Sequence, residues 1–393
     1  MVLEFETSRR SSVGLEWELA LVDADSGILR QVAPAVMTEL GPDSRARHVK
    51  PEFLRNTVEI VSDVNDTVAG AITDLENGVA RVQEVIRPMR AELMGAGTHP
   101  FAPWSQQQVT DKERYATVVD RAQVWGRQQV VYGVHMHVGI EDRDKVLPIV
   151  RSLLVYVAHL QALSASSPYW DAADTGYASM RALIFQQLPT AGLPYQFTAW
   201  DELERYVADM LKTGVIDDFT EVRWDIRPAP HFGTVEVRIC DGTSNVAELA
   251  ALGALVHCLV EHFSTLLDEG RPLPVMPRWY VHENKWRAAR YGMDAIIILD
   301  ADGNEELITD ALPRLLDDLA PVAERLGCAA ELDGIRDIVR LGASYQRQRA
   351  VAAAHGGGQR GLEAVVGALV AELHAGRPLD PTVLGRGAAG AAT

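Results

Sequence analysis

Two glutamates that lie two residues apart, Glu16 and Glu18, have the spacing to hold a divalent metal ion. They belong to residues 12–21, where acidic and apolar residues alternate in the period typical of a β-strand with one buried face. Both carboxylates therefore leave the same face of that strand, where their mutual repulsion costs on the order of 1–4 kcal/mol, depending on the local dielectric. A cation between them would remove this cost. A plain solvated strand face is the alternative interpretation.

A second acidic pair, Glu52 and Glu59, has a spacing that needs a turn. The two residues are an odd number of positions apart, so a continuous strand would place them on opposite faces. They can converge only if residues 56–57 interrupt the strand with a turn or bulge. Glu59 is flanked by Val58 and Ile60, and a charge in such apolar surroundings needs a partner or a cation.

Two histidines, His135 and His137, share one face of a strand predicted over residues 130–140. A His-x-His strand also occurs in zinc or iron hydrolases, so a metal-dependent amidohydrolase is a competing hypothesis. Imidazoles among several carboxylates suit Mg²⁺ or Mn²⁺ better than zinc. Core histidines that are merely hydrogen-bonded are a third interpretation.

Glu236 and Arg238 lie on one face of a further strand, predicted over residues 234–239. An exposed salt bridge between them would contribute little to stability. The functional interpretation makes Glu236 a metal ligand and places Arg238 against a phosphate, because the planar guanidinium fork matches oxyanions. Further candidate anion contacts are Arg181, Arg227, Arg287 and Arg290. The sequence contains no Walker A loop, no GxGxxG after a strand and no GxSxG nucleophile elbow, so any nucleotide would be held by metals and scattered cations.

Composition narrows the class of protein. The chain has 393 residues and a net charge of −17, which disfavours nonspecific binding to nucleic acids. No apolar run reaches the roughly 18 residues that a membrane span needs, and the N-terminus lacks a signal-peptide pattern. Cys240, Cys258 and Cys328 form no CxxC pair and suggest no disulfide frame. We therefore expect a cytoplasmic protein without membrane or nucleic-acid partners.

The elements that must position these residues alternate irregularly between strands and helices, which favours an α+β fold over regular βαβ units. Beyond the strand at 12–21, strands are predicted over 48–61, 94–97, 130–140 and 234–239, and helices over 34–40, 66–93, 111–127, 143–165, 201–212 and 246–267. Residues 1–10 are interpreted as an N-terminal extension and residues 11–375 as a single catalytic domain, mostly helical over 271–375. Residues 376–393 are rich in Ala and Gly and are predicted to be disordered.

Taken together, several motifs make the chain recognisable. They are Gly-Leu-Glu-Trp-Glu at 14–18, Thr-Val-Glu at 57–59, Gly-Thr-His-Pro at 97–100, Gly-Val-His-Met-His-Val-Gly at 133–139 and Gly-Thr-Val-Glu-Val-Arg at 233–238. In this combination the sequence resembles the glutamate–cysteine ligase type 2 family, and within it the YbdK-like carboxylate–amine ligase branch, over roughly residues 11–375.

The resemblance implies a glutamine-synthetase-like fold, with a concave antiparallel sheet backed by helices. It implies ATP and two or three Mg²⁺ ions, with Mn²⁺ as a substitute, bound on that sheet. A carboxylate attacks the γ-phosphate of ATP to give an acyl phosphate, and an amine then displaces phosphate to form an amide. The simplest substrates are glutamate and cysteine, although the branch is known for weak activity with this pair. Relatives suggest a homodimer.

The resemblance also implies roles for individual residues. Metal ligands would be Glu16, Glu18, Glu52, Glu59, His135 and Glu236. The catalytic set would be Arg238, Glu59 and Glu236; the nucleotide would contact Arg238, His137, Arg287 and Lys285; and the substrate would contact Arg181 and Arg227. The segment at 283–285 departs from the usual family pattern, which leaves the acceptor amine open. A catalytically degenerate nucleotide-binding homologue is a further alternative, and the intact set of acids counts against it.

Overall fold

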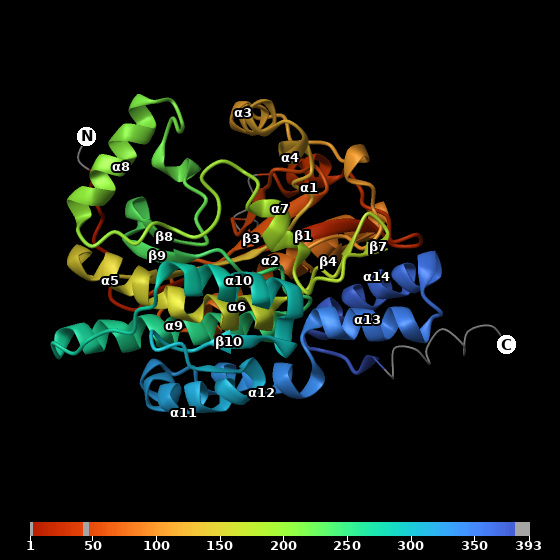
Figure 1. Ribbon diagram of the computed structural model, residues 1–393. Helices are drawn as coiled ribbons and strands as arrows, with labels where there is room; N and C mark the ends of the chain where they lie inside the picture. Colours follow the sequence, from red (N-terminus) through yellow and green to blue (C-terminus); the bar gives the residue numbers. More distant parts are fainter. Residues whose placement is uncertain (1–2, 42–46, 382–393) are drawn as a thin grey trace.

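An antiparallel sheet forms the centre of the computed structural model, which describes residues 3–41 and 47–381 (Figure 1). Within these residues seven strands form the sheet, in the order β2-β3-β1-β5-β9-β8, and β4 pairs with the far end of β1. The strands are β1 (Val13–Asp23), β2 (Val49–Pro51), β3 (Thr57–Val61), β4 (Ala91–Met94), β5 (Val134–Gly139), β8 (Ile226–Ala229) and β9 (Thr234–Val237). The predicted α+β fold with an antiparallel sheet is confirmed.

The alternation in β1 produces the two faces of the sheet. Val13, Leu15 and Trp17 are each 1% exposed and enter the main hydrophobic core, whereas Glu16 and Glu18 leave the opposite face. Burial of such side chains contributes about 1.5–3 kcal/mol each, so a shift of the strand by one residue would be strongly disfavoured. The apolar face therefore determines which way the acids point.

Long apolar helices cover the buried face. They are α2 (Val68–Ile86), α5 (Arg143–Leu153), α6 (Val157–Ser164) and α9 (Val246–Asp268). By length and composition alone, residues 143–164 and 246–268 could span a membrane, which the sequence analysis did not expect; however, 83% and 78% of their apolar windows are buried inside the fold. Their side chains are covered by strands on one side and by neighbouring helices on the other, as in the core helices of a folded domain.

Further helices surround these two layers (Figure 1). Helices α3 and α4 lie above the sheet, and α8 lies beside them, on the side away from α9, α11 and α12. Their bounds, with those of the remaining elements, are α1 (Ala33–Leu40), α3 (Glu113–Ala122), α4 (Val124–Arg127), α7 (Met180–Phe185), α8 (Trp200–Lys212), α10 (Arg278–Tyr291), α11 (Ile308–Leu326), α12 (Ala329–Leu341), α13 (Ser344–Ala354) and α14 (Gly358–Ala375), with small hairpins β6 (Tyr169–Trp170) with β7 (Ala173–Asp174) and β10 (Ile296–Ile298) with β11 (Glu305–Leu307).

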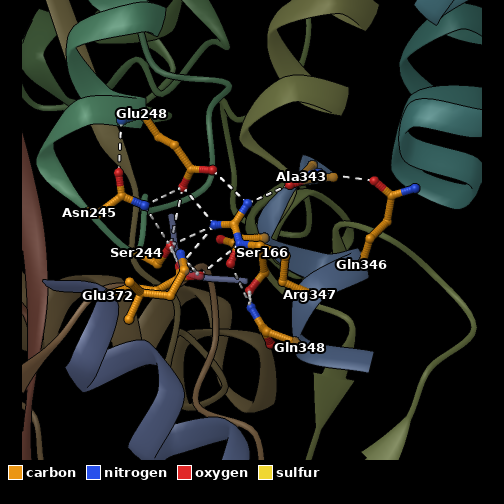
Figure 2. Close-up of polar contacts among 12 residues, drawn as sticks. Ser166, Ser244, Asn245, Glu248, Ala343, Gln346, Arg347, Gln348 and Glu372 are labelled. Atoms are coloured by element: carbon orange, nitrogen blue, oxygen red, sulfur yellow. Dashed lines mark hydrogen bonds and ion pairs between the residues drawn. The ribbon is translucent and has the colours of Figure 1, made fainter. Parts of the chain in front are cut away.

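The C-terminal helices are attached to the sheet layer through a buried ionic network (Figure 2). Arg347 on α13 donates to Glu248 at the start of α9 and to Glu372 on α14, with shortest distances of 2.8 Å. The neighbouring Gln348 donates to the carbonyl oxygen of Ser166 at 2.8 Å. Because the three ionic groups are buried, removal of Arg347 would leave two buried carboxylates without their cation and destabilise the attachment by about 3–5 kcal/mol.

Two predicted helix boundaries were wrong. Helix α2 ends at Ile86 and not near residue 93, because a 3-10 turn at Arg87–Met89 contains Pro88 and a left-handed Arg90 redirects the chain into β4. The helix predicted over 111–127 is divided at Gln123, whose φ is 49°. The predicted tail lies mostly outside the described residues, from 382 onward. Cys258 and Cys328, which are distant in sequence, have Sγ atoms 3.6 Å apart and are free thiols.

Candidate active site

The register of the sheet brings the predicted acids and histidines together on its open face. In β1 and its neighbours, Glu18 lies opposite Glu59, and Glu16 lies opposite His135. In the next pair, His137 lies opposite Glu236. These pairings join residues that are separated by about 40 to 120 positions along the chain, and they place them in one continuous patch.

The turn between the paired strands β2 and β3 allows Glu52 and Glu59 to face the same cavity despite their odd spacing. Strand β2 ends at Pro51 and β3 begins at Thr57, with the turn between them. The fully buried Asn56 accepts a hydrogen bond from the Thr57 hydroxyl at 2.8 Å within this turn. The interruption that convergence requires is therefore present, although it spans residues 52–56 and Thr57 already belongs to β3. Burial raises the pKa of Glu59, and the nearby charges of Glu16 and Glu52 raise it further.

Two sets of possible metal ligands share Glu16. One set is Glu16, Glu59 and His135, and the other is Glu16, His137 and Glu236; in each set the ligand atoms lie within 4.8 Å of one another. The Nδ1 atom of His135 is 2.8 Å from Glu16 Oε2, and the Nε2 atom of His137 is 3.5 Å from Glu16 Oε1. The family resemblance implied a nucleotide contact for His137, but its ring lies beside the carboxylates of Glu16 and Glu236. The two histidines belong to different sets, which does not favour a His-x-His hydrolase centre.

The carboxyl groups of the patch have pKa values that are strongly shifted, in both directions. Burial, with the charge of Glu52 added, raises the pKa of Glu18 to about 7. Burial and the charges of Glu16 and Glu52 raise the pKa of Glu59 well above its ordinary value. Burial opposes ionisation of Glu16 as well, but hydrogen bonds from His135 and His137 outweigh it and hold the pKa of that carboxyl well below its usual range. Oxygen-rich ligands that repel one another in this way fit hard divalent cations such as Mg²⁺.

Guanidinium groups adjoin the acids. Glu236 is 1% exposed and accepts from Arg227 Nε at 2.6 Å and from Arg238. Burial opposes its ionisation, but the two arginines hold the pKa of Glu236 below its usual range. Glu236 thus sits at the boundary between the acidic patch and a cationic one, where it can contact a metal ion while it orients Arg238.

A cavity of about 620 Å³ opens over this boundary. Its walls include Glu16, Glu18, Glu52, Glu59, His135, Arg181, Arg227 and Arg238, that is, most of the predicted site. Sequence reasoning missed Arg114, Tyr115 and Arg223, which also line it. Tyr115 on α3 donates to Glu52 at 3.2 Å, and nothing in the local sequence pattern distinguishes it from an ordinary helix residue.

Three predicted anion contacts have other partners. Lys285 Nζ is 2.6 Å from Asp225 Oδ2 in a buried ion pair, and Arg287 bonds to Glu283 and Glu305. Arg290 donates to the carbonyl oxygen of Gly176. None of these three side chains lines the cavity. The structure therefore does not bring Lys285 and Arg287 into the cavity with the other predicted site residues.

An antiparallel sheet whose open face gathers carboxylates, histidines and arginines beside one cavity has the groups that a metal-dependent enzyme of phosphoryl transfer requires. Residues 12–364 match glutamate–cysteine ligase family 2 (GCS2), and the chain belongs to that family.

Relatives support this assignment over nearly the whole chain. A protein of Arthrobacter sp. (strain FB24) named "Putative glutamate--cysteine ligase 2-1" is 56% identical over 383 residues, which are 96% of this chain and 99% of that protein. A protein of the same name from Mycobacterium sp. (strain KMS) is 57% identical over 371 residues, 94% of this chain and 97% of the relative. The fold is similar to a crystal structure of a glutamate–cysteine ligase from Francisella tularensis in complex with AMP (TM-score 0.66, 14% identity), covering 97% of this chain and 92% of that one. The chain is accordingly an ATP-dependent ligase of the glutamate–cysteine ligase type.

Proposed function

We propose that the chain joins the γ-carboxylate of L-glutamate to the amine of L-cysteine, with Mg²⁺-ATP as the phosphoryl donor and an acyl phosphate as the intermediate. The observation that supports this proposal is the shared cavity, which is lined by the predicted metal ligands Glu16, Glu18, Glu52 and Glu59 together with Arg181, Arg227 and Arg238. Phosphoryl transfer depends on charge neutralisation and alignment and needs no protein nucleophile. The cavity brings together the acids that would hold metal ions for charge neutralisation and the arginines that would align the reacting groups.

The proposed metal ligands are the residues of the two Glu16-centred sets and the neighbouring acids, namely Glu16, Glu18, Glu52, Glu59, His135, His137 and Glu236. Bound Mg²⁺ would supply charge neutralisation for the triphosphate and hold its terminal group in line with the attacking carboxylate. Two ions are the minimum that the two sets suggest, and Mn²⁺ would suit the same oxygen and imidazole donors.

Arg238 is proposed to stabilise the phosphoryl group during transfer, because its guanidinium lines the cavity and is oriented by Glu236. Arg181 and Arg227 are proposed to contact the carboxylate substrate. Arg227 is partly committed to Glu236, whereas Arg181 has no carboxylate partner within 4.0 Å in the described part of the chain. By analogy with the family, we also propose that the protein acts in the cytoplasm as a homodimer.

Hydroxylamine trapping tests the reaction class. With Mg²⁺, ATP, glutamate and hydroxylamine, we expect glutamyl hydroxamate and ADP in equal amounts, because hydroxylamine intercepts an acyl phosphate. The Glu16→Gln variant should form neither, and Glu76→Gln, an exposed glutamate on α2, serves as the matched control with wild-type rates. Amide hydrolysis that needs zinc and no ATP would instead indicate an amidohydrolase. A parallel matrix of acids and amines, scored by ADP release, tests the substrate pair.

A further inference from the structure

Asp241 is a fully buried carboxylate behind the cavity wall, and the mechanism above does not use it. It follows β9 and Cys240, and its exposed fraction is 0%. Its Oδ2 atom accepts from the Ser166 amide at 3.0 Å and from the Ser167 hydroxyl at 2.6 Å. Its Oδ1 atom accepts from the Ser179 hydroxyl at 2.8 Å. A buried acid with this many donors is held in one orientation, because any rotation would leave a desolvated oxygen or hydroxyl unpaired.

The two hydroxyls that donate to Asp241 also hold the backbone around Arg181. Ser167 Oγ accepts from the Arg181 amide at 3.0 Å. Ser179 is the N-cap of α7, and its Oγ accepts from the Ala182 amide at 3.3 Å. A hydroxyl has one proton, so when that proton is given to Asp241 the lone pairs are left for the amides. Asp241 therefore determines how the first turn of α7 is held.

The side chain that this turn presents is a buried cation with unused hydrogen-bonding capacity. Arg181 is 2% exposed and lines the cavity. Its guanidinium bonds only to the carbonyl oxygens of Arg238 and Ile239, at 3.4 Å, and its Nε atom has no partner among the described residues. Gly133 faces it so closely that a Cβ there would lie 2.2 Å from Arg181 Nη2. The surrounding backbone thus confines the guanidinium but leaves its Nε donor without an acceptor among the described residues.

We propose that Asp241 is a positioning residue for the carboxylate substrate, acting on Arg181 through Ser167 and Ser179 and through its own negative charge. The charge offsets the cost of a guanidinium in a desolvated wall, and the serines fix the backbone from which it extends. This inference rests on the proposed function, in which Arg181 contacts the substrate.

Steady-state kinetics of Asp241→Asn, with ATP, L-glutamate and L-cysteine, test the proposal. Asparagine keeps the shape but removes the charge and one acceptor. We expect the KM for glutamate to rise at least tenfold while the KM for ATP changes less than twofold. Ser179→Ala should shift the glutamate KM in the same direction. Thr67→Ala, which removes the N-cap hydroxyl of α2, is the matched control and should leave both KM values unchanged.

A double-mutant cycle separates positioning from general destabilisation. In an Arg181→Gln background, Asp241→Asn should change the glutamate KM less than twofold, because the residue through which Asp241 acts is already lost. Equal increases in both KM values, or fully additive effects, would overturn the proposal. If Asp241→Asn does not fold, the cycle is run with Ser179→Ala and read in the same way.

A crystal structure of Asp241→Asn without substrate tests the positioning role of Asp241 independently of the proposed substrate pair. If the wild type releases no ADP with glutamate and cysteine, the proposed substrate pair fails, and this structure alone decides the role of Asp241. Displacement of the Arg181 guanidinium from Gly133 supports positioning. An Arg181 that keeps its place and its α7 contacts refutes it.

Discussion

Replacement of Glu18 by glutamine is expected to stabilise the metal-free protein while it abolishes catalysis. Only 12% of the Glu18 side chain is exposed, and desolvation and the charge of Glu52 raise its pKa to about 7, against an ordinary value of 4.5. At a pH above both values the folded protein must hold this group ionised, and the difference of about 2.5 pH units corresponds to about 3 kcal/mol of lost stability. Glutamine removes the charge and can still accept the hydrogen bond from the Gly133 amide.

The effect has a defined sign and pH window. Between about pH 4.5 and pH 7 the folded state binds more protons at Glu18 than the unfolded state does, so the stability of the wild type falls as pH rises through this window. Glu18→Gln should therefore be about 3 kcal/mol more stable than the wild type at pH 8 in EDTA, and equal to it near pH 4.5. Mg²⁺ should reverse the order at pH 8, because it stabilises only a protein that binds it.

Urea unfolding at pH 8 and at pH 4.5, each with EDTA or Mg²⁺, measures these differences. Glu76→Gln on α2 again provides a matched loss of an exposed charge, with an expected change within 0.5 kcal/mol by the general behaviour of surface sites. A Glu18→Gln variant that is less stable than the wild type at pH 8 in EDTA would refute the reasoning, since the carboxylate would then be stabilising the fold.

Three further predictions follow from other contacts. Arg238→Lys should lower kcat by about 10²–10³-fold with little change in the KM for ATP, because a point charge cannot reproduce the guanidinium fork; an unchanged kcat would exclude phosphoryl stabilisation by this residue. Lys285→Met should lower the free energy of unfolding in urea by about 3–5 kcal/mol, because it leaves the buried Asp225 unpaired, and the added substitution Asp225→Asn should restore most of that loss. A raised KM for ATP in this double variant would instead indicate that Lys285 contacts the nucleotide. Burial lowers the pKa of His159 to about 4, so between pH 6.5 and pH 4 the unfolded state binds more protons than the folded state, and stability falls by about 1.4 kcal/mol for each pH unit as pH falls. His159→Phe should remove this contribution to the pH dependence of the free energy of unfolding. An unaltered pH dependence would contradict the assignment.

Local patterns predicted the faces of the strands well. Alternation over residues 12–21 placed Glu16 and Glu18 opposite a buried apolar face, and the structure has that arrangement. The pattern could not say which residue lies across from which, because β1 pairs with β5 about 120 residues later. The distribution of His135 and His137 between two ligand sets follows from that register, so it could not be deduced from spacing within one strand.

Residues whose roles depend on distant partners were the ones that sequence reasoning misplaced or missed. Lys285 carries the positive charge expected of an anion contact, but its ion-pair partner Asp225 is 60 residues away in the chain. Asp241 follows a strand like an ordinary loop residue, and its serine partners come from a segment about 60 to 75 residues earlier. Burial decides both cases, since a desolvated charge must find its partner wherever the fold supplies one.

Transfer of oxygen from the carboxylate substrate to phosphate tests the central claim most directly. Glutamate labelled with ¹⁸O in its γ-carboxylate is incubated with the enzyme, Mg²⁺, ATP and cysteine, and the released phosphate is examined by ³¹P NMR. An acyl phosphate requires one ¹⁸O atom in each phosphate released during amide formation, because the carboxylate oxygen that attacks ATP leaves with the phosphoryl group. Unlabelled phosphate, released at the same rate as ADP, would show that water and not the carboxylate receives the phosphoryl group, and it would contradict the account.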